Sequence, residues 1–238
     1  MSTLSKLAQR FQGVENIAPR EWRLPLRYHG QRLVGGLEPE MDLLEQLAPK
    51  DCTALDVGAN HGIYTYALSR FVRSVHCFEP LAECCHYVRD HPATNVTVHN
   101  VALSDRAGEL ELHVPIIDGR AVYTRASLDR PDGPSESRRV EVRTLDSYAL
   151  TGVGFIKIDV EGVEAAVLRG GTRTLETCNP NLLVEIDRAR HSRDSFLAVH
   201  AALQAMGYSV HVCEARELVE CQDVWGASTQ HVNFIFIK

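Results

Sequence analysis

The sequence predicts an α/β fold in which one mainly parallel sheet has helices on both faces and an antiparallel last strand. Short apolar runs bounded by turn residues recur along the chain, as expected of buried strands. Most of them are followed by a segment with helical periodicity, and this alternation is typical of βαβ units. The last two expected strands have no strong helical pattern between them, so we expect the final strand to run antiparallel.

The elements are expected in the following order. A helical pattern starts at Glu38 and stops at Pro49. Seven strands are expected at 53–57, 74–78, 95–99, 153–159, 181–186, 208–213 and 232–237. The expected helices between them are 62–71, 81–91, 162–170 and 193–206.

Two regions depart from this alternation. Residues 1–40 are basic and are interpreted as an N-terminal extension that forms a lid or an oligomer contact, with a homodimer as one alternative. Residues 41–238 are expected to form one domain with a β-rich insertion near 104–150, where two period-2 segments flank a polar loop rich in Pro and Gly. We expect a substrate to contact the extension and the insertion, because long loops often carry function.

Composition narrows the functional class. The 238 residues are 45% hydrophobic and 24% charged, as in an ordinary globular chain. A net charge of −6 argues against a nucleic-acid partner. We expect no membrane contact and a cytoplasmic location, because we find no apolar window of 18 residues and no secretory leader. The odd count of 7 cysteines favours reduced thiols.

The end of the first strand predicts a nucleoside site. Asp56, Gly58 and Gly62 form a D-x-G-x-x-x-G turn, which differs from the G-x-G-x-x-G of dinucleotide-binding proteins. A carboxylate at this turn would repel a pyrophosphate but would attract an ammonium group or a ribose hydroxyl. Glu79-Pro80 ends the second strand, where an acid commonly holds a ribose diol. Two acids without a phosphate-binding glycine loop indicate a cationic nucleoside ligand, and S-adenosylmethionine is the expected cofactor.

The third strand leads into Asn100, Val101 and Ala102, which we expect to contact the base through an amide group and small apolar side chains. Each of these observations has an ordinary structural explanation, such as a turn or a helix cap. Their order along the predicted strand–turn–helix units favours the cofactor interpretation.

The segment 155–162 predicts the chemical end of the site. Alternation places Lys157 and Asp159 on one side of a strand, and Glu161 follows at its end. Two chemistries fit: a carboxylate near Lys157 acts as a general base, or Asp159, Glu185 and Asp187 hold Mg²⁺. The structural alternative is a buried Lys157–Asp159 ion pair with solvated acids.

These residues resemble the FkbM family of S-adenosylmethionine-dependent methyltransferases. The resemblance extends over roughly residues 38–238, and its motifs are LDVGANHGIYT (55–65), FEP (78–80), NVALSD (100–105), TLDSY (144–148), FIKIDVEGVEAAVLRGG (155–171) and LLVEID (182–187). It implies a class I Rossmann-like fold with a seven-stranded sheet. It also implies O-methylation of a hydroxyl on a polyketide, a sugar or a similar natural product.

The resemblance also assigns residues. Cofactor binding is assigned to Asp56, Gly58, Asn60, Gly62 and Glu79, and the active centre to the run from Lys157 to Gly162. Many relatives read E-x-H after the fifth strand, whereas this chain has Asp187 at the histidine position.

Two other functions remain as alternatives. One is a catalytically inactive partner protein that binds S-adenosylmethionine, against which Lys157, Asp159 and Glu161 count. The other is a nicotinamide-dependent oxidoreductase, which the missing G-x-G-x-x-G disfavours.

Overall fold

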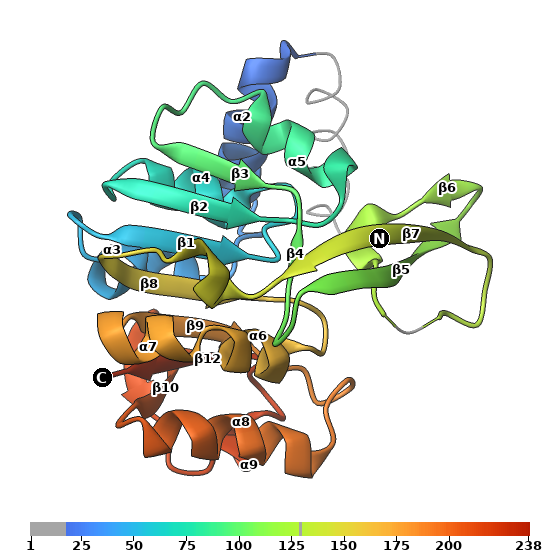
Figure 1. The fold of residues 1–238 in the computed structure, drawn as a ribbon. Coiled ribbons are helices and arrows are strands. Elements are labelled where there is room, and N and C mark those ends of the chain that lie inside the picture. Colours follow the sequence, from blue (N-terminus) through green and yellow to red (C-terminus); the bar gives the residue numbers. More distant parts are fainter. Residues whose placement is uncertain (1–17, 129) are drawn as a thin grey trace.

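The centre of the molecule is an eight-stranded sheet (Figure 1). The computed structural model describes residues 18–128 and 130–238. The strand order is β11-β10-β12-β9-β8-β1-β2-β3. The bounds are β1 (Thr53–Val57), β2 (Ser74–Phe78), β3 (Val96–His99), β8 (Val153–Ile158), β9 (Asn181–Glu185), β10 (Ser209–Glu214), β11 (Glu217–Glu220) and β12 (Asn233–Ile237).

The pairing confirms the predicted parallel sheet. Strand β1 pairs in parallel with both β2 and β8, and the parallel pairing continues from β2 to β3 and from β8 to β9. Strand β12 runs antiparallel to β9 and to β10, as expected of the last strand. The carboxyl ends of β1, β2, β3, β8 and β9 therefore meet at one edge of the sheet.

The expectation of seven strands is wrong, because β11 adds an eighth at the edge of the sheet. Strands β10 and β11 form a hairpin whose two turn residues, Ala215 and Arg216, both have positive φ. Such turns usually carry Asn or Gly. A turn made of Ala and Arg gives no sequence signal, so the charged strand after it is not recognisable.

Helices cover both faces of the sheet, as predicted. On one face, Ile156 and Ile158 of β8 belong to a core that includes Phe196 of α8 (Arg193–Ala205). On the other, Phe155 belongs to a core that includes Leu68 of α4 (Ile63–Ser69). Further α-helices after residue 40 are α3 (Leu44–Leu47), α5 (Ala82–Arg89), α6 (Glu164–Gly170), α7 (Thr172–Cys178) and α9 (Val224–Ala227), and 3-10 turns are η1 (Pro39–Leu43), η2 (Tyr123–Arg125) and η3 (Leu145–Tyr148).

The described part of the N-terminal extension contains helix α2 (Arg20–Leu33). This helix contacts α4 and α5, and its side chains Leu24 and Tyr28 are buried in the core. Residues 1–17, the rest of the predicted lid or oligomer contact, lie outside the described residues.

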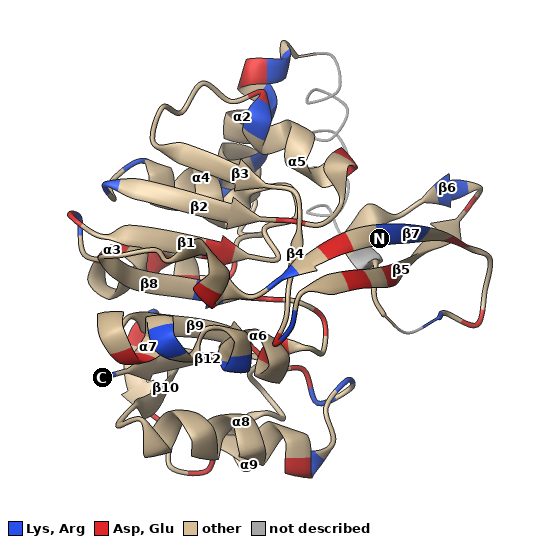
Figure 2. Ribbon diagram, viewed as in Figure 1, with Lys and Arg blue, Asp and Glu red and all other residues tan. Residues whose placement is uncertain are grey.

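The insertion forms a second sheet beside the carboxyl edge. Its strands are β4 (Ala102–Leu103), β5 (Gly108–Ile117), β6 (Arg120–Ala121) and β7 (Ser135–Arg143), in the order β4-β7-β5-β6. Strands β5 and β7 extend away from the main sheet (Figure 1). Charged residues occur on both strands (Figure 2), and Glu109 of β5 forms an ion pair with Arg139 of β7.

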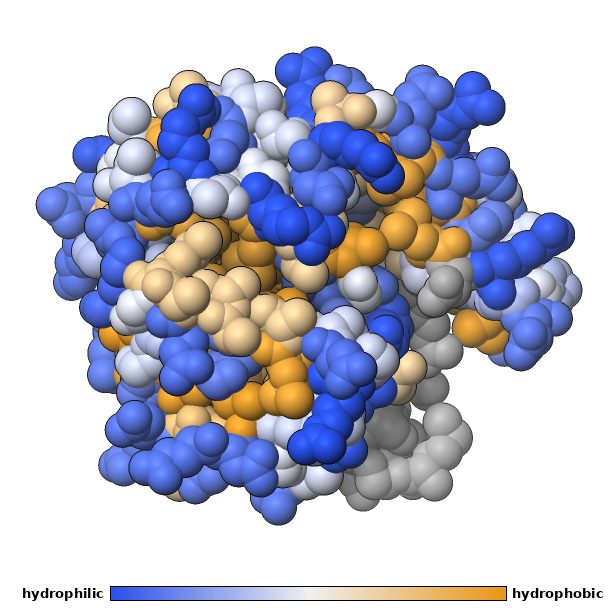
Figure 3. Space-filling view, turned by 60° about the horizontal axis from the view of Figure 1, so that its bottom comes forward, coloured by the Kyte–Doolittle hydropathy of each residue, from blue (hydrophilic) through white to orange (hydrophobic). Residues whose placement is uncertain are grey.

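The face that carries α8 is a mixture of apolar and hydrophilic side chains (Figure 3). It includes an apolar groove lined by residues of α6, α7 and α8, among them Leu168, Leu175 and Leu203. No helix within residues 18–128 and 130–238 combines the length and the apolar character needed to cross a bilayer.

At Gly58, the turn after β1 approaches the end of β8 more closely than a residue with a side chain would allow. Its φ is 78°, and a Cβ at this position would lie 1.8 Å from the carbonyl oxygen of Asp159. The turn after β1 and the end of β8 are therefore fixed against each other by a residue without a side chain.

We predict that Gly58→Ala lowers the free energy of unfolding by about 3 kcal/mol or more, because the methyl group overlaps backbone and the φ is unfavourable. Urea denaturation measures this change. Gly108→Ala is the control, since its Cβ would have no neighbour within 4 Å; we expect a change within about 0.5 kcal/mol. Equal effects of both substitutions would contradict the close approach.

Candidate active site

Two adjoining cavities lie at the carboxyl edge of the sheet. The first, here called the apolar cavity, is lined by Val57, Gly58, Asn60, Phe78–Leu81, Val101–Leu103, Leu110, Leu112, 123–124, 126–128, 159–161 and Val163. The second, the polar cavity, is lined by Arg27, Gln31, 36–38, Met41, Asp56, 58–61, Ile63, Tyr64, Thr124, Lys157 and Asp159. The two share Gly58, Asn60, Thr124 and Asp159, so they meet at the turn after β1.

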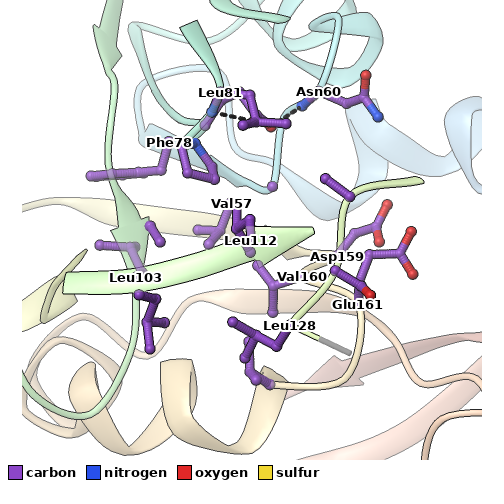
Figure 4. A pocket seen from close by; sticks show the side chains of 18 of the residues that line it. Val57, Asn60, Phe78, Leu81, Leu103, Leu112, Leu128, Asp159, Val160 and Glu161 are labelled. Atoms are coloured by element: carbon purple, nitrogen blue, oxygen red, sulfur yellow. Dashed lines mark hydrogen bonds between the residues drawn. The ribbon is translucent and has the colours of Figure 1, made fainter. Parts of the chain in front are cut away.

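Glu79 is held at the border of the apolar cavity. Its Oε2 accepts a hydrogen bond from Asn60 N at 2.8 Å and its Oε1 from Leu81 N at 2.8 Å (Figure 4). Burial raises the pKa of Glu79 to about 7, although these two hydrogen bonds act to lower it. Each carboxylate oxygen keeps a second lone pair for a ligand.

Asn100 stabilises the backbone at the border of this cavity. Its amide nitrogen donates to Glu79 O at 3.0 Å and to Pro80 O at 2.8 Å. The amide therefore fixes the backbone that carries Glu79. The neighbours Val101 and Ala102 do line the cavity, as does Pro80.

The rest of the apolar cavity is mainly hydrocarbon. Leu103 and the insertion residues Leu112 and Leu128 lie on one side, while Asp159 and Glu161 lie at the other end (Figure 4). A flat, weakly polar group such as a nucleobase fits walls of this kind. Sequence reasoning did not single out Leu110, Leu112 or Leu128, because the alternation of β5 shows which residues share a face but not what that face covers.

The polar cavity contains a buried cation. The side chain of Lys157 is 4% exposed, and its Nζ lies 2.8 Å from Asp159 Oδ2 and 4.7 Å from the centre of the Tyr64 ring. Burial acts to lower the pKa of Lys157, but the carboxylates of Asp159 and Asp56 outweigh burial and raise it. Lys157 therefore stays protonated at neutral pH.

Asp56 lies beside this cation, because β1 and β8 pair with Asp56 opposite Lys157. It is fully buried, and Thr65 Oγ1 donates to its Oδ2 at 2.6 Å. Burial raises the pKa of Asp56, and Lys157 partly offsets this effect. Within the described residues, Asp56 Oδ1 and Asn60 Oδ1 are buried without a hydrogen-bond partner.

A further layer supports the Tyr64 ring. The hydroxyl of Tyr64 donates to Glu38 Oε2 at 2.6 Å, and Asn233 Nδ2 donates to the same oxygen at 3.1 Å. Burial raises the pKa of Tyr64 well above its usual value. Glu38, Tyr64 and Asn233 come from three distant segments, so this contact could not be predicted from a local residue pattern.

The structure also places the glycine-turn residues. The Cβ of a residue at Gly62 would lie 2.2 Å from Val88 Cγ2, so Gly62 lets α4 approach α5. Burial lowers the pKa of His61 to about 3, with a further contribution from Arg27. His61 is therefore neutral at physiological pH.

The other predicted acids have different surroundings. Glu161 pairs with Arg190, and Asp187 Oδ1 accepts from Ala189 N at 2.8 Å. Burial raises the pKa of Glu185 to about 8, and the negative charge of Asp159 is the second largest cause of this increase. Among residues 18–128 and 130–238, no group of three or more His, Cys, Asp or Glu is placed to hold a metal ion. The arrangement of Asp159, Glu185 and Asp187 thus differs from the Mg²⁺ ligand set considered above.

The sheet, its helices and the position of the cavities define an α/β protein of the class I methyltransferase fold. Residues 56–210 match the family described as "Methyltransferase FkbM domain". This match covers well over half of the chain, and the chain belongs to the FkbM family of S-adenosylmethionine-dependent methyltransferases.

Two relatives illustrate the similarity. "2-O-methyltransferase NoeI" of Sinorhizobium fredii (strain NBRC 101917 / NGR234) is 29% identical over 161 residues, which are 58% of this chain and 65% of that protein. The chain thus spans less than two thirds of the length of this relative. A crystal structure of Methyltransferase FkbM from Methylobacillus flagellatus KT superposes with a TM-score of 0.55 at 16% identity, over 99% of this chain and 58% of that one. It shares the fold.

The raised pKa of Glu79 predicts a pH-dependent stability. Between about pH 4.5 and pH 7 the folded protein keeps a proton on Glu79 that the unfolded chain has lost. The Glu79 contribution to stability therefore falls as the pH rises through this range and is constant above it. Relative to Glu79→Gln, the wild type should lose on the order of 3 kcal/mol. Urea denaturation at pH 5 and pH 8 tests this, and a difference between the two proteins that stays constant with pH would contradict it.

Proposed function

We propose that this chain transfers the methyl group of S-adenosylmethionine to a hydroxyl group of a small molecule, such as a sugar or another natural product. The observation that carries this proposal is the Lys157–Asp159 pair at the junction of the two cavities. It combines a fixed cation with a carboxylate at the point where an apolar cavity meets a polar one.

The residues present fit the cofactor. In the proposed pose, Glu79 accepts hydrogen bonds from the ribose hydroxyls, and Val101, Ala102 and Leu103 pack against the adenine. The unpartnered buried oxygens of Asp56 and Asn60 suit the cationic methionine end. When bound, S-adenosylmethionine supplies an electrophilic methyl group on a sulfonium, whose C–S bonding electrons leave with the sulfur.

Asp159 is the proposed general base. The acceptor oxygen forms its bond to the methyl carbon while the hydroxyl proton passes to the Asp159 carboxylate. Lys157 cannot take this proton, because it is already protonated, and it holds the carboxylate in place through their 2.8 Å contact. Glu161, paired with Arg190 at the border of the apolar cavity, is proposed as a second acid of the active centre.

We place the acceptor in the polar cavity. Arg27, Gln31 and Glu38 of the N-terminal segment line it together with Thr124 of the insertion. Polar side chains of both kinds suit an acceptor that carries hydroxyl groups. The name of the Sinorhizobium relative, a 2-O-methyltransferase, supports oxygen as the methyl acceptor. Asp159 is engaged by Lys157 and Asp187 by a backbone N–H, which favours general-base over magnesium-assisted transfer.

Removing the Glu79 carboxylate should weaken cofactor binding. We predict that Glu79→Ala raises the Kd for S-adenosylhomocysteine on the order of 10- to 100-fold, because the ribose hydroxyls lose a charged acceptor. Isothermal titration calorimetry measures the Kd. The control is Glu109→Ala, an exposed acid on β5 whose loss should leave the Kd unchanged. A wild-type Kd in Glu79→Ala would refute the assignment of Glu79.

A screen with methyl-labelled S-adenosylmethionine and a panel of sugar and polyketide alcohols tests the activity, with and without a chelator. We expect label transfer that survives the chelator. No transfer to any acceptor, together with tight cofactor binding, would support an inactive partner protein. Tight binding of a nicotinamide nucleotide without affinity for S-adenosylmethionine would favour an oxidoreductase.

Asp159→Asn should mainly lower turnover. We predict a kcat reduced at least 100-fold with the Kd for S-adenosylhomocysteine changed less than about threefold, because the base is lost while the shape is kept. Steady-state kinetics with the acceptor from the screen measure this. Asp51→Asn, an exposed acid before the amino end of β1, is the matched control. A wild-type kcat with a raised acceptor KM would show that Asp159 binds the acceptor and is not the base.

A further inference from the structure

Two loops at the carboxyl edge of the sheet are joined by a pair of side-chain bridges. The first, here called the β8 loop, comprises residues 159–163 and carries Asp159 and Glu161. The second, the β9 loop, comprises residues 186–192 and follows the neighbouring parallel strand. Glu161 pairs with Arg190 at the surface, and Glu164 at the start of α6 lies 2.9 Å from His191 in the interior, measured from Oε2 to Nε2.

Glu164 holds the backbone of the β8 loop. Its side chain is 2% exposed, and its Oε1 accepts from Gly162 N at 3.0 Å and from Val160 N at 3.3 Å. The loop has an unusual backbone, since Glu161 has a φ of 60° and Gly162 a φ of 111°. Such conformations persist where the surroundings hold them. Here one buried carboxylate receives both N–H groups that the conformation turns inward.

His191 connects this carboxylate to the β9 loop. Its Nε2 faces Glu164 Oε2, and its Nδ1 lies 3.1 Å from the carbonyl oxygen of Asp187. Both ring nitrogens therefore lie close to oxygen atoms, and the contact between Nε2 and Oε2 is a close ion-pair approach whose angles are not those of a hydrogen bond. The contact with Glu164 accordingly raises the pKa of His191. When His191 is protonated, its imidazolium and the buried Glu164 carboxylate resist separation, because either charge alone would be costly to bury.

We propose that Glu164 and His191 are positioning residues that fix Val160 and Glu161 as the wall of the apolar cavity. Neither is among the residues lining the two cavities, whereas Asp159, Val160 and Glu161 are. Glu164 acts through two backbone N–H groups, and His191 keeps the Glu164 carboxylate oriented toward them. The proposal rests on the proposed function in one respect, namely that this cavity receives the cofactor.

The test compares Glu164→Ala with Glu164→Gln in the 238-residue chain. The amide oxygen of Gln can still accept from Val160 N and Gly162 N, whereas Ala leaves both without an acceptor. We expect Glu164→Ala to raise the Kd for S-adenosylhomocysteine at least tenfold by calorimetry, and Glu164→Gln to stay within about threefold of the wild type. A wild-type Kd in Glu164→Ala, or an equal loss in both variants, would overturn the proposal.

Tyr208→Phe separates positioning from general destabilisation. Tyr208 is buried at the opposite edge of the sheet, and its hydroxyl donates to Pro180 O at 3.0 Å. This variant should lower the Tm without changing the Kd. An increase in Kd as large as that of Glu164→Ala would overturn the proposal, because binding would then follow stability alone.

Amide hydrogen exchange of a peptide spanning 158–166 provides a readout that needs no ligand. We expect the amides of Val160 and Gly162 to exchange at least tenfold faster in Glu164→Ala than in the wild type, with protection restored in Glu164→Gln. Should the wild type fail to bind S-adenosylhomocysteine, the proposed function would fail while this exchange pattern still supports the positioning role. Equal exchange in all three proteins would overturn that role.

Discussion

The ammonium group of Lys157 is buried in the middle of the sheet, and the carboxyl edge is arranged around its charge. An unpaired buried cation would cost several kcal/mol, so neighbouring strands must supply compensating groups. Asp56 does so from β1, Asp159 from the end of β8, and the Tyr64 ring from α4. The close approach of Gly58 to the Asp159 carbonyl holds the two strand ends in this register. The groups that neutralise Lys157 are thus also the ones that face the polar cavity.

The two cavities differ in a way that suits two ligands. The apolar cavity has mainly hydrocarbon walls, with Asp159 and Glu161 at one end and Glu79, whose oxygens are already oriented by backbone N–H groups, at its border. The polar cavity is lined by charged side chains of both signs. Arg27 and Lys157 are its cations, and Asp56 is one of its acids. In the proposed arrangement the nucleoside occupies the first and the acceptor the second, and Asp159 borders both. Proton transfer and methyl transfer would then take place at their junction.

Much of this could be predicted from the sequence, and the exceptions have physical causes. Strand β1 has the expected bounds because its apolar run ends at a glycine turn. The acids that follow strand ends lie at one edge of the sheet, because the carboxyl ends of parallel strands share that edge. The eighth strand was missed because its turn, Ala215-Arg216, lacks turn residues. The amide of Asn100 donates to backbone oxygens, and no residue pattern predicts this partner. The Glu164–His191 contact joins segments far apart in the chain, and neither residue belongs to a strand-end pattern.

The central claim is that the cofactor spans the junction, with its nucleoside beside Glu79 and its sulfur facing the Lys157–Asp159 pair. A crystal structure of the complex with S-adenosylhomocysteine tests this most directly. Both ribose hydroxyls are expected within hydrogen-bond distance of the Glu79 carboxylate, and the sulfur above Gly58 and Asp159. A ribose bound away from Glu79, or a sulfur directed away from the polar cavity, would contradict it.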